Sequence, residues 1–533
     1  MQSLAESGVG RVCVPVCVKR AAELRPSIER AAEAGDVVEL RLDCLEADEL
    51  DEARAQLGGL LTRAGRPFLI TYRPKEQGGG VGLSLEERAA FWREVPLWLR
   101  AAAGRGRAFV DVELDLLESP HAERLGALFE GFTVICSHHD FRETPADLEQ
   151  IYERMARTRA DVSKLATRAN SITDSLTLMR LLERGRREGR GVIAVSMGAA
   201  GVLTRVLAPA FGAFLTYGSL DAGQATAPGQ IEARELRRLY RVRELSEQTA
   251  VTGIVGSPVA HSLSPYMHNT GFASLGLDAV YLPFEVVDLP EFVRRMVDPR
   301  TRELRWNLRG LSVTAPHKQA VIPLLDTVAP AAARVGAVNT LVISEERGLE
   351  GYNTDADASV VPLAGLVGLQ GARVAVLGAG GAARALLWAL GERGASATVF
   401  ARDEARARAV AEEFGVAGAR LEGASFEGFD VVANTTPLGT RGERETETPA
   451  AESQLRGARV AYDLVYNPAE TRFLREARAA GCETVGGLGM LVAQAEEQFR
   501  LWTGRVPPPG VMQAAAERKL LDVRCQMLVT AHN

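Results

Sequence analysis

The sequence predicts an α/β protein in which an N-terminal (β/α)8 barrel, the TIM-barrel fold, is followed by a two-domain α/β region with a Rossmann nucleotide-binding domain. Three observations support this prediction. The 533 residues exceed what one ordinary core accommodates. Eight strand-like runs alternate with helical patterns up to about residue 235. A glycine-rich turn then joins a buried strand to a helix after Arg373.

Composition excludes several classes of protein. Hydrophobic residues make up 46% and charged residues 24%, as in ordinary soluble proteins. A net charge of −6 gives no general attraction to nucleic acid or anionic membranes, so we expect neither as a partner. We find no secretory-signal pattern and no apolar run of about 18 residues, so we expect no membrane span and a cytoplasmic location.

The six cysteines are predicted to be buried thiols in a reducing compartment. They stand at positions 13, 17, 44, 136, 482 and 525, mostly within apolar runs. Cys13 and Cys17 share a face of one strand, but no further ligands follow at metal-binding spacing. We therefore expect no metal site.

Eight strands are expected in the barrel, separated by helical segments such as Leu148–Arg157 and Leu176–Arg187. An open doubly wound sheet is the alternative, but such sheets commonly have fewer strands. The predicted strands are Arg11–Val18, Val37–Leu42, Pro67–Tyr72, Ala108–Leu114, Phe132–Ser137, Asp161–Ala166, Gly191–Ser196 and Ala213–Tyr217.

Polar residues gather at the ends of these strands, where barrel enzymes carry their chemistry. In strand order they are Glu39 and Arg41, Arg73 and Glu76, Asp111 and Glu113, His138 and His139, Lys164, and finally Thr226 and Gln230, whereas strand seven ends at Met197. Packing alone does not readily explain polar groups from so many strands at one rim.

Lys164 lies in the apolar strand run DVSKLA, where a lysine is costly unless it is used. A lysine paired with a barrel glutamate is the plain structural reading. The functional reading is a desolvated amine that attacks a carbonyl and forms an imine, which acidifies the adjacent carbon. His139, on the neighbouring strand, could then remove a proton and later protonate a departing hydroxyl.

Together, VELRLD, YRPKEQGG, HHDF, the strand-six lysine, SMG, GVLTRV and ATAPGQ resemble type I 3-dehydroquinate dehydratases over nearly the whole first half. The resemblance implies that Lys164 forms the Schiff base, that His139 is the general acid/base and that Glu76 orients the histidine. Thr226 stands where serine is usual. The implied substrate-binding residues are Glu39, Arg41, Arg73, Met197, Arg205, Thr226 and Gln230.

The second half carries a dinucleotide-binding pattern. Gly378-x-Gly380-x-x-Ala383 follows the strand ARVAVLG and opens a helix, so its backbone could approach a pyrophosphate. The next strand ends near Arg402 and Arg406, which suit a 2′-phosphate and favour NADPH/NADP+ over NAD. Solvated surface arginines are the alternative, and Asp403 could cap the following helix.

The motifs GSPVAHSLSP, GLSVTAPHK, GAVNT, GYNTDAD, NTTPLG, DLVYNPAET and GGLGMLVAQAEEQF together resemble shikimate dehydrogenases from about residue 250 onward. The resemblance implies that Lys318 and Asp355 are the catalytic pair, although two such residues are more often a plain salt bridge. The implied substrate contacts are Ser262, Ser264, Thr314, Asn339, Tyr466 and Gln494. The implied cofactor contacts are Gly378, Ala379, Gly380, Gly381, Ala382, Arg402, Arg406, Thr435 and Gly487. Departures from the usual pattern are Ser312, Ala356, Ala401 and Thr440.

The two resemblances define the expected domains. These are residues 1–235 for the barrel, 236–249 for a helical connector, 250–350 for a substrate-binding domain, 351–485 for the Rossmann NADP-binding domain, and 486–533 for C-terminal helices returning to the substrate-binding domain.

The expected product of the first half, 3-dehydroshikimate, is the expected substrate of the second. We therefore expect a bifunctional lyase and NADP-dependent oxidoreductase of the shikimate pathway, acting on 3-dehydroquinate, 3-dehydroshikimate and shikimate. An NAD-dependent quinate/shikimate dehydrogenase fusion and a non-catalytic shikimate-binding regulator are the alternatives. The sequence leaves an oligomer open.

Overall fold

The computed structural model describes residues 10–99, 104, 107–221 and 223–530, with side chains to residue 523. The start of the first expected domain and the end of the last one lie outside the described residues. The chain divides into two compact units. One extends to Ala250 and includes Leu282–Met296 and Thr301–Asn307, and the other contains the remainder of the chain.

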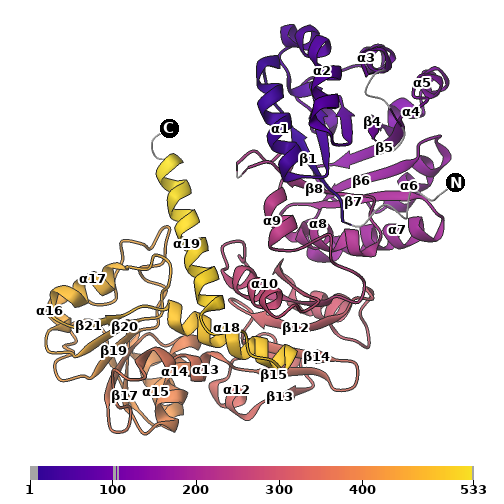
Figure 1. Cartoon of the computed structure of the whole chain (residues 1–533). Coiled ribbons are helices and arrows are strands. Elements are labelled where there is room, and N and C mark those ends of the chain that lie inside the picture. The colour runs from indigo at the N-terminus through magenta and orange to yellow at the C-terminus, as the bar shows by residue number, and fades with distance from the viewer. Residues whose placement is uncertain (1–9, 100–103, 105–106, 222, 531–533) are drawn as a thin grey trace. The chain divides into compact units, whose positions relative to one another are not determined.

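The first unit is a barrel of parallel strands in sequence order, and each of the eight expected strands is present (Figure 1). Closure comes from β1 pairing with β8 and from the Phe214 N–H, which donates to the Val192 carbonyl of β7 at 2.8 Å. The strands are β1 (Val12–Val16), β2 (Val37–Arg41), β3 (Phe68–Thr71), β4 (Ala108–Glu113), β5 (Thr133–Asp140), β6 (Val162–Arg168), β7 (Gly191–Met197) and β8 (Thr216–Ser219), with a short β9 (Ile231–Glu232) beside β8.

Helices surround the strands (Figure 1), and α6 is an amphipathic example whose apolar face packs inward. In α6 this face is formed by Leu148, Ile151, Tyr152 and Met155, which are buried at helical spacing. The helices are α1 (Leu24–Ala34), α2 (Leu50–Ala64), α3 (Leu85–Leu99), α4 (Leu114–Leu117), α5 (Ala122–Leu128), α6 (Leu148–Arg157), α7 (Ser175–Arg187) and α8 (Val202–Leu207).

The expected helical connector is helical only at its start. Helix α9 (Ala233–Arg238) ends near the start of the connector, and turns occupy most of residues 239–249. Arg241 has a φ of 51°, in the left-handed region, which a continuing right-handed helix excludes.

The expectation that all six cysteines are thiols is wrong for two of them. Cys17 and Cys44 form a disulfide with a Cα–Cα distance of 5.4 Å, whereas Cys13, Cys136 and Cys482 are free and buried. Cys17 follows β1 and Cys44 follows β2, and these strands are paired neighbours. The barrel therefore brings together two residues that are 27 positions apart in sequence. The sixth cysteine, at position 525, lies outside the residues whose side chains are described.

The second half begins with a six-stranded mixed sheet in the order β11-β10-β12-β14-β15-β13. Helix α10 (Ser264–Ser274) packs with the C-terminal helices α18 (Leu488–Thr503) and α19 (Val511–Thr530), and α18 also contacts β12 and β14. The strands are β10 (Ala250–Gly256), β11 (Ala279–Glu285), β12 (Leu308–Val313), β13 (Thr327–Val328), β14 (Thr340–Ser344) and β15 (Gly348–Tyr352). Short helices α11 (Leu289–Phe292) and α12 (Pro330–Val335) lie in the connections.

A parallel sheet in the order β18-β17-β16-β19-β20-β21 forms the Rossmann domain. Alternate residues of β16 enter two separate cores: Val374 and Val376 pack with α14 and α15, whereas Ala375 and Leu377 pack with α17. The strands are β16 (Arg373–Leu377), β17 (Ser396–Ala401), β18 (Ala417–Arg420), β19 (Val431–Asn434), β20 (Val460–Asp463) and β21 (Glu483–Val485). The helices are α13 (Asp355–Ala358), α14 (Gly381–Glu392), α15 (Glu404–Phe414), α16 (Glu452–Leu455) and α17 (Arg472–Ala479).

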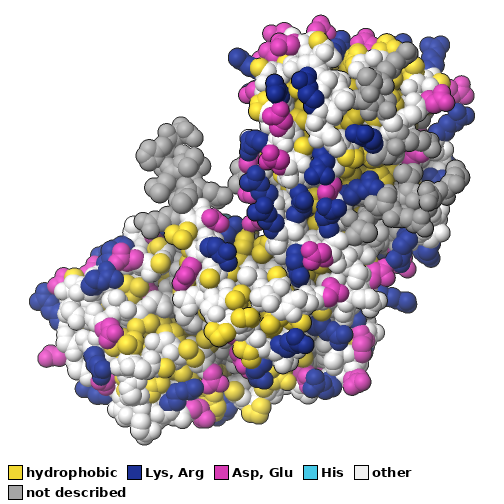
Figure 2. Space-filling model, viewed as in Figure 1, with side chains coloured by type: hydrophobic (Ala, Val, Ile, Leu, Met, Phe, Trp, Pro, Cys, Tyr) yellow, Lys and Arg dark blue, Asp and Glu magenta, His cyan; other side chains and the backbone are white. Residues whose placement is uncertain are grey.

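Charged side chains of both signs occur across the visible face of each unit (Figure 2). Among the helices that the structure describes, none has the length and apolar character needed to cross a membrane.

Candidate functional sites

The carboxyl ends of the barrel strands surround one cavity. It contains every barrel site residue expected from the sequence except Glu76. Its lining is Glu39, Arg41, Arg73, Gln77, Gly78, His139, Phe141, Lys164, Ala166, Val195, Met197, Arg205, Tyr217, Thr226, Ala227 and Gln230.

Lys164 is buried in this cavity and surrounded by negative charge. Its Nζ donates to Asp111 Oδ2 at 2.8 Å and lies 3.9 Å from Glu39 Oε1. The same nitrogen is 4.3 Å from the centre of the Tyr217 ring. Thr71 in turn donates to Glu39 Oε1 at 2.7 Å, which holds that carboxylate in place. The lysine is therefore paired with a carboxylate, as the structural interpretation expected. It also lies at the cavity wall, as the functional interpretation expected.

His139 projects from β5 into the same cavity. Its Nδ1 lies 3.2 Å from Arg73 Nη1 and 3.3 Å from Gln77 Oε1. Burial, followed by the positive charges of Arg73 and Lys164, holds the pKa of His139 well below its usual range. The neutral imidazole, which can accept a proton, is thus the favoured form.

The structure does not place Glu76 against this histidine. Glu76 is exposed and does not line the cavity, whereas Gln77, the next residue, contacts His139. Both lie in the single 3-10 turn Lys75–Gln77, where successive side chains point about 120° apart. The sequence of this turn does not reveal which side chain faces the cavity. By chemistry, a carboxylate is the more obvious partner for a histidine, which favours Glu76.

Arg73 links the histidine to a buried ionic network. Its guanidinium lies 2.8 Å from Asp111 Oδ2, 3.2 Å from Glu113 Oε1 and 2.6 Å from Ser137 Oγ. Although burial alone would raise it, Arg73 and Lys164 hold the pKa of Asp111 well below its ordinary value. Burial raises the pKa of Glu113 to about 7 despite the opposing charge of Arg73. The network therefore holds the Arg73 guanidinium against the histidine through two buried carboxylates.

Arg205 is a buried cation at the cavity wall. It is 1% exposed, donates to the Pro228 carbonyl at 2.8 Å, and forms no ion pair with any residue that the structure describes. Its Nε has no hydrogen-bond partner among those residues, and burial lowers its pKa to about 10. An unpaired buried guanidinium costs several kcal/mol of folding free energy, and a ligand carboxylate would satisfy it.

The loop beside Arg205 carries Thr226 and Gln230. Gln230 Oε1 accepts from the Thr226 N–H at 2.8 Å, so the loop is closed on itself at the cavity rim. Its hydroxyl and amide lie within reach of a polar ligand in the cavity.

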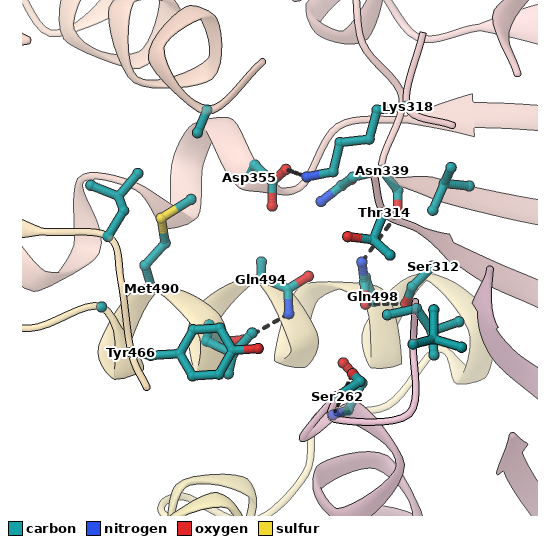
Figure 3. Close-up of a pocket in the computed structure, with 18 of the residues that line it drawn as sticks. Ser262, Ser312, Thr314, Lys318, Asn339, Asp355, Tyr466, Met490, Gln494 and Gln498 are labelled. Atoms are coloured by element: carbon teal, nitrogen blue, oxygen red, sulfur yellow. Dashed lines mark hydrogen bonds and ion pairs between the residues drawn. The ribbon is translucent and has the colours of Figure 1, made fainter. Parts of the chain in front are cut away.

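A second cavity lies in the other unit, between α18 and the ends of β10 and β12. Lys318 Nζ donates to Asp355 Oδ2 at 2.5 Å on one side, and Tyr466, Gln494 and Ser262 lie on the other (Figure 3). Every expected substrate contact of the second half lines this cavity: Ser262, Ser264, Thr314, Asn339, Tyr466 and Gln494.

Gly487 and Ala382, expected at the cofactor, also line this second cavity. Gly487 is the residue before α18, and a Cβ there would lie 2.2 Å from the Leu464 carbonyl oxygen. Close packing of backbone against backbone therefore requires glycine at this position.

A separate cleft follows the carboxyl ends of β16, β17 and β19, at the point where strand order reverses. Its predicted lining residues are Gly378, Ala379, Gly380, Arg402, Arg406 and Thr435. Gly381 is the first residue of α14 and is not among the lining residues.

The cleft fits a phosphorylated dinucleotide. A Cβ at Gly380 or Gly381 would meet nothing within 4 Å, so a ligand can approach the backbone, and no side chain caps the N-terminus of α14. Arg402, Arg406 and Arg444 form no ion pair among the described residues. Asp403 is committed to the helix, because its Oδ1 accepts from the Arg406 N–H at 3.2 Å.

Several lining residues escaped the sequence analysis. Gln77 and Tyr217 line the barrel cavity, Gln498 the second cavity, and Arg444 the cleft. Gln498 stands four residues after Gln494 on the same helix face, a spacing that could have indicated it. Within the described part of the chain, no group of three or more His, Cys, Asp or Glu could hold a metal ion.

Comparisons with known proteins match each half separately. A family model described as type I 3-dehydroquinase matches residues 12–247. The model for the shikimate dehydrogenase substrate binding domain matches residues 254–341, and that for the shikimate 5′-dehydrogenase C-terminal domain matches residues 487–517.

One relative spans both halves. The bifunctional 3-dehydroquinate dehydratase/shikimate dehydrogenase, chloroplastic, of Arabidopsis thaliana is 34% identical over 527 residues, covering 93% of this chain and 82% of that protein. The shikimate dehydrogenase (NADP(+)) of Oleidesulfovibrio alaskensis is 48% identical over 263 residues, covering 48% of this chain and 90% of that protein. A crystal structure of shikimate 5-dehydrogenase from Thermus thermophilus with NADP(H) and shikimate is 41% identical and covers 50% of this chain and 99% of that one, with a TM-score of 0.46.

Proposed function

This chain belongs to the family of bifunctional 3-dehydroquinate dehydratase/shikimate dehydrogenases, and we propose that it converts 3-dehydroquinate to shikimate in two steps. The observation that supports this most directly is that each half has its own cavity with a lysine in it. Lys164 and His139 line one cavity, and Lys318 forms a hydrogen bond with Asp355 in the other.

For the dehydration, we assign the attacking amine to Lys164. The neutral amine adds to the substrate carbonyl and water leaves, which gives an imine. Because the imine accepts electron density, the adjacent carbon becomes acidic, and the neutral His139 removes its proton. The hydroxyl on the next carbon departs as water with that proton, and hydrolysis of the imine releases 3-dehydroshikimate and Lys164.

The remaining barrel residues bind and orient the substrate. Arg205 pairs with its carboxylate, because it is a buried cation without a counter-ion among the described residues. Asp111 and Glu39 hold the ammonium form of Lys164 before and after reaction. Thr226 and Gln230 cover the substrate from the rim.

For the reduction, Lys318 and Asp355 handle the proton. When bound, NADPH supplies the hydride that reaches the ketone carbon. The oxygen then needs a proton, and the hydrogen-bonded Lys318–Asp355 pair lies at the cavity wall, so it can deliver one. The hydroxyls and amides opposite the pair fix the polyhydroxylated ring.

NADPH rather than NADH is the proposed cofactor. Arg402 and Arg406 follow β17, where a 2′-phosphate would lie, and neither has a competing ion pair among the described residues. Since Asp403 is used as the cap of α15, its carboxylate is turned to the helix rather than left to bind ribose hydroxyls.

The deciding experiment supplies purified protein with NADPH and 3-dehydroquinate only. Loss of NADPH absorbance requires both sites, so it would establish dehydration followed by reduction. Without a change, 3-dehydroshikimate is added: consumption then would mean that the barrel is inactive, and continued silence would favour a binding protein. Faster turnover with NADH would instead support the NAD-dependent alternative.

A further inference from the structure

A continuous chain of hydrogen bonds runs beneath the second cavity and ends at Asn339. It starts at Tyr281 on β11 and passes through Ser312 on β12 and Gln498 on α18 to Thr340 and Asn339 at the start of β14. Ser312, Gln498 and Asn339 are labelled in Figure 3. All five side chains are at least 95% buried. Of these, Ser312, Asn339 and Gln498 line the cavity.

Sheet register explains why one amide connects the two strands. Ser312 and Thr340 are directly opposite each other in the antiparallel β12–β14 pair, so their hydroxyls point to the same face. Gln498 spans them: its Oε1 accepts from Ser312 Oγ at 2.7 Å, and its Nε2 donates to Thr340 Oγ1 at 3.1 Å.

Backbone groups, which cannot exchange donor and acceptor roles, fix the direction of the chain. Gln498 Nε2 faces the Asn339 carbonyl oxygen at 3.4 Å, so this end of the amide must be the nitrogen. Ser312 must therefore donate to Gln498, and Tyr281 must donate to Ser312, at 2.8 Å.

The orientation of Asn339 follows from the same logic. Its Oδ1 accepts from the Thr354 backbone N–H at 2.8 Å, so this atom must be the oxygen. Thr340 Oγ1, already an acceptor from Gln498, donates to the same Oδ1 at 2.8 Å. With two donors, Oδ1 is satisfied. Nδ2 donates to Thr354 Oγ1 at 3.0 Å, which leaves one N–H for a ligand.

We infer that Asn339 is an obligate hydrogen-bond donor toward the substrate: the Thr354 backbone N–H sets its orientation, and Gln498 and Thr340 are positioning residues that fill the second acceptor position of Oδ1. The inference rests on the proposed dehydrogenase function. Asn339 lies beside the Lys318–Asp355 pair (Figure 3), so it selects an acceptor oxygen, such as a hydroxyl or carbonyl oxygen, at a fixed place next to the reacting carbon. A ligand that presents only a donor there would leave two N–H or O–H groups facing each other.

The test compares Thr340→Val with Thr340→Ser. Valine keeps the shape but removes the hydroxyl that fills Asn339 Oδ1, whereas serine keeps the hydroxyl. Thr340→Val should raise the KM for 3-dehydroshikimate about tenfold, with little change in kcat and none in the KM for NADPH. Thr340→Ser should restore the wild-type KM, and Gln498→Leu should behave like Thr340→Val.

Controls separate positioning from folding. Glu497→Gln, on the outer side of α18, should change nothing. Because the dehydratase cavity lies in the other compact unit, the kcat for reduction and the KM for NADPH report whether the dehydrogenase half of each variant is intact. An unchanged KM in Thr340→Val, or equal losses in Val and Ser variants, would overturn the inference. If Gln498→Leu does not fold, the Thr340 pair still decides.

Failure of the proposed function would look different. In that case the wild-type chain would not reduce 3-dehydroshikimate at all. Calorimetric titration with shikimate alone would then still test the donor role, because Thr340→Val should weaken binding relative to Thr340→Ser. Equal affinity of the two variants would count against it.

Discussion

At the scale of single residues, the barrel site depends on a lysine that the protein neutralises with several partners at once. Lys164 is buried between Asp111, Glu39 and the Tyr217 ring, so its ammonium is stabilised without exposure to solvent. In the proposed mechanism this ammonium must first give up a proton, because only the neutral amine has the lone pair that attacks a carbonyl.

Replacing this lysine should remove one activity only. Lys164→Ala should abolish dehydration and the covalent trapping of substrate by borohydride, since no imine can form, while reduction of 3-dehydroshikimate continues. Mass spectrometry of the borohydride-treated protein measures the trapping. Lys19→Ala, which removes an exposed lysine, is the control. Trapping that persists in Lys164→Ala would place the imine on another lysine.

The histidine beside it should respond to charge at position 77. In the wild-type chain, burial and the positive charges of Arg73, Lys164 and Arg41 lower the pKa of His139, while Asp111 raises it. A carboxylate 3.3 Å from Nδ1 would stabilise the imidazolium, so Gln77→Glu should raise this pKa. In the proposed mechanism the base is the neutral imidazole, so activity is lost as pH falls through this pKa. The acidic limb of kcat/KM for dehydration should therefore move to higher pH by about one unit.

The neighbouring residue provides a matched control for that experiment. Glu76→Gln removes an exposed carboxylate one position away and should leave the pH profile unchanged. If Glu76→Gln moved the limb and Gln77→Glu did not, the orienting residue would be Glu76 after all.

At the scale of elements, the turn from β16 into α14 determines whether a dinucleotide can bind. Gly378 has a φ of 118°, and a Cβ there would lie 2.6 Å from Thr435 Oγ1. Gly378→Ala should therefore distort the turn and raise the KM for NADPH at least tenfold, while dehydration is unchanged. Steady-state kinetics with varied NADPH measure this.

Gly391 supplies the control within the same helix. A Cβ at Gly391 meets nothing within 4 Å, and the residue lies in α14, so Gly391→Ala should stabilise the helix by about 0.5–1 kcal/mol and leave the KM for NADPH unaltered. Equal effects of the two substitutions would show that the turn has no special role in cofactor binding.

The turn between β17 and α15 should determine whether NADPH or NADH is preferred. Arg402→Asp replaces a cation by an anion where the 2′-phosphate is proposed to lie, so the preference for NADPH over NADH should fall by at least tenfold in kcat/KM. Arg408→Ala, on the exposed side of α15, is the control. An unchanged ratio would assign the phosphate to Arg406 or Arg444.

At the scale of the whole molecule, the two cavities belong to different compact units, and no described residue lines both. Lys318→Ala should therefore stop reduction while leaving dehydration at wild-type rate. Equimolar Lys164→Ala and Lys318→Ala proteins should together convert 3-dehydroquinate to shikimate, because the intermediate can pass through solution. Coupled NADPH consumption measures this, and a mixture that stays inactive would contradict independent sites.

The sequence by itself determined the two folds, their order and most of the polar residues that line the two cavities and the cleft. Strand and helix periodicity depends on neighbours only a few residues away, so all eight barrel strands and the β16–α14 turn could be found from local pattern. Lys164, His139, Lys318 and Asp355 could be found because each is a polar residue at the end of an apolar strand or within a specific motif.

Only the tertiary structure decided which neighbours these residues have. Gln77 rather than Glu76 faces His139 because of the rotation of a single turn, and Cys17 meets Cys44 because β1 and β2 pair. The directed chain from Tyr281 to Asn339 joins four separate segments through sheet register and a returning helix. Such contacts depend on register, rotation and packing between distant segments, which local sequence does not encode.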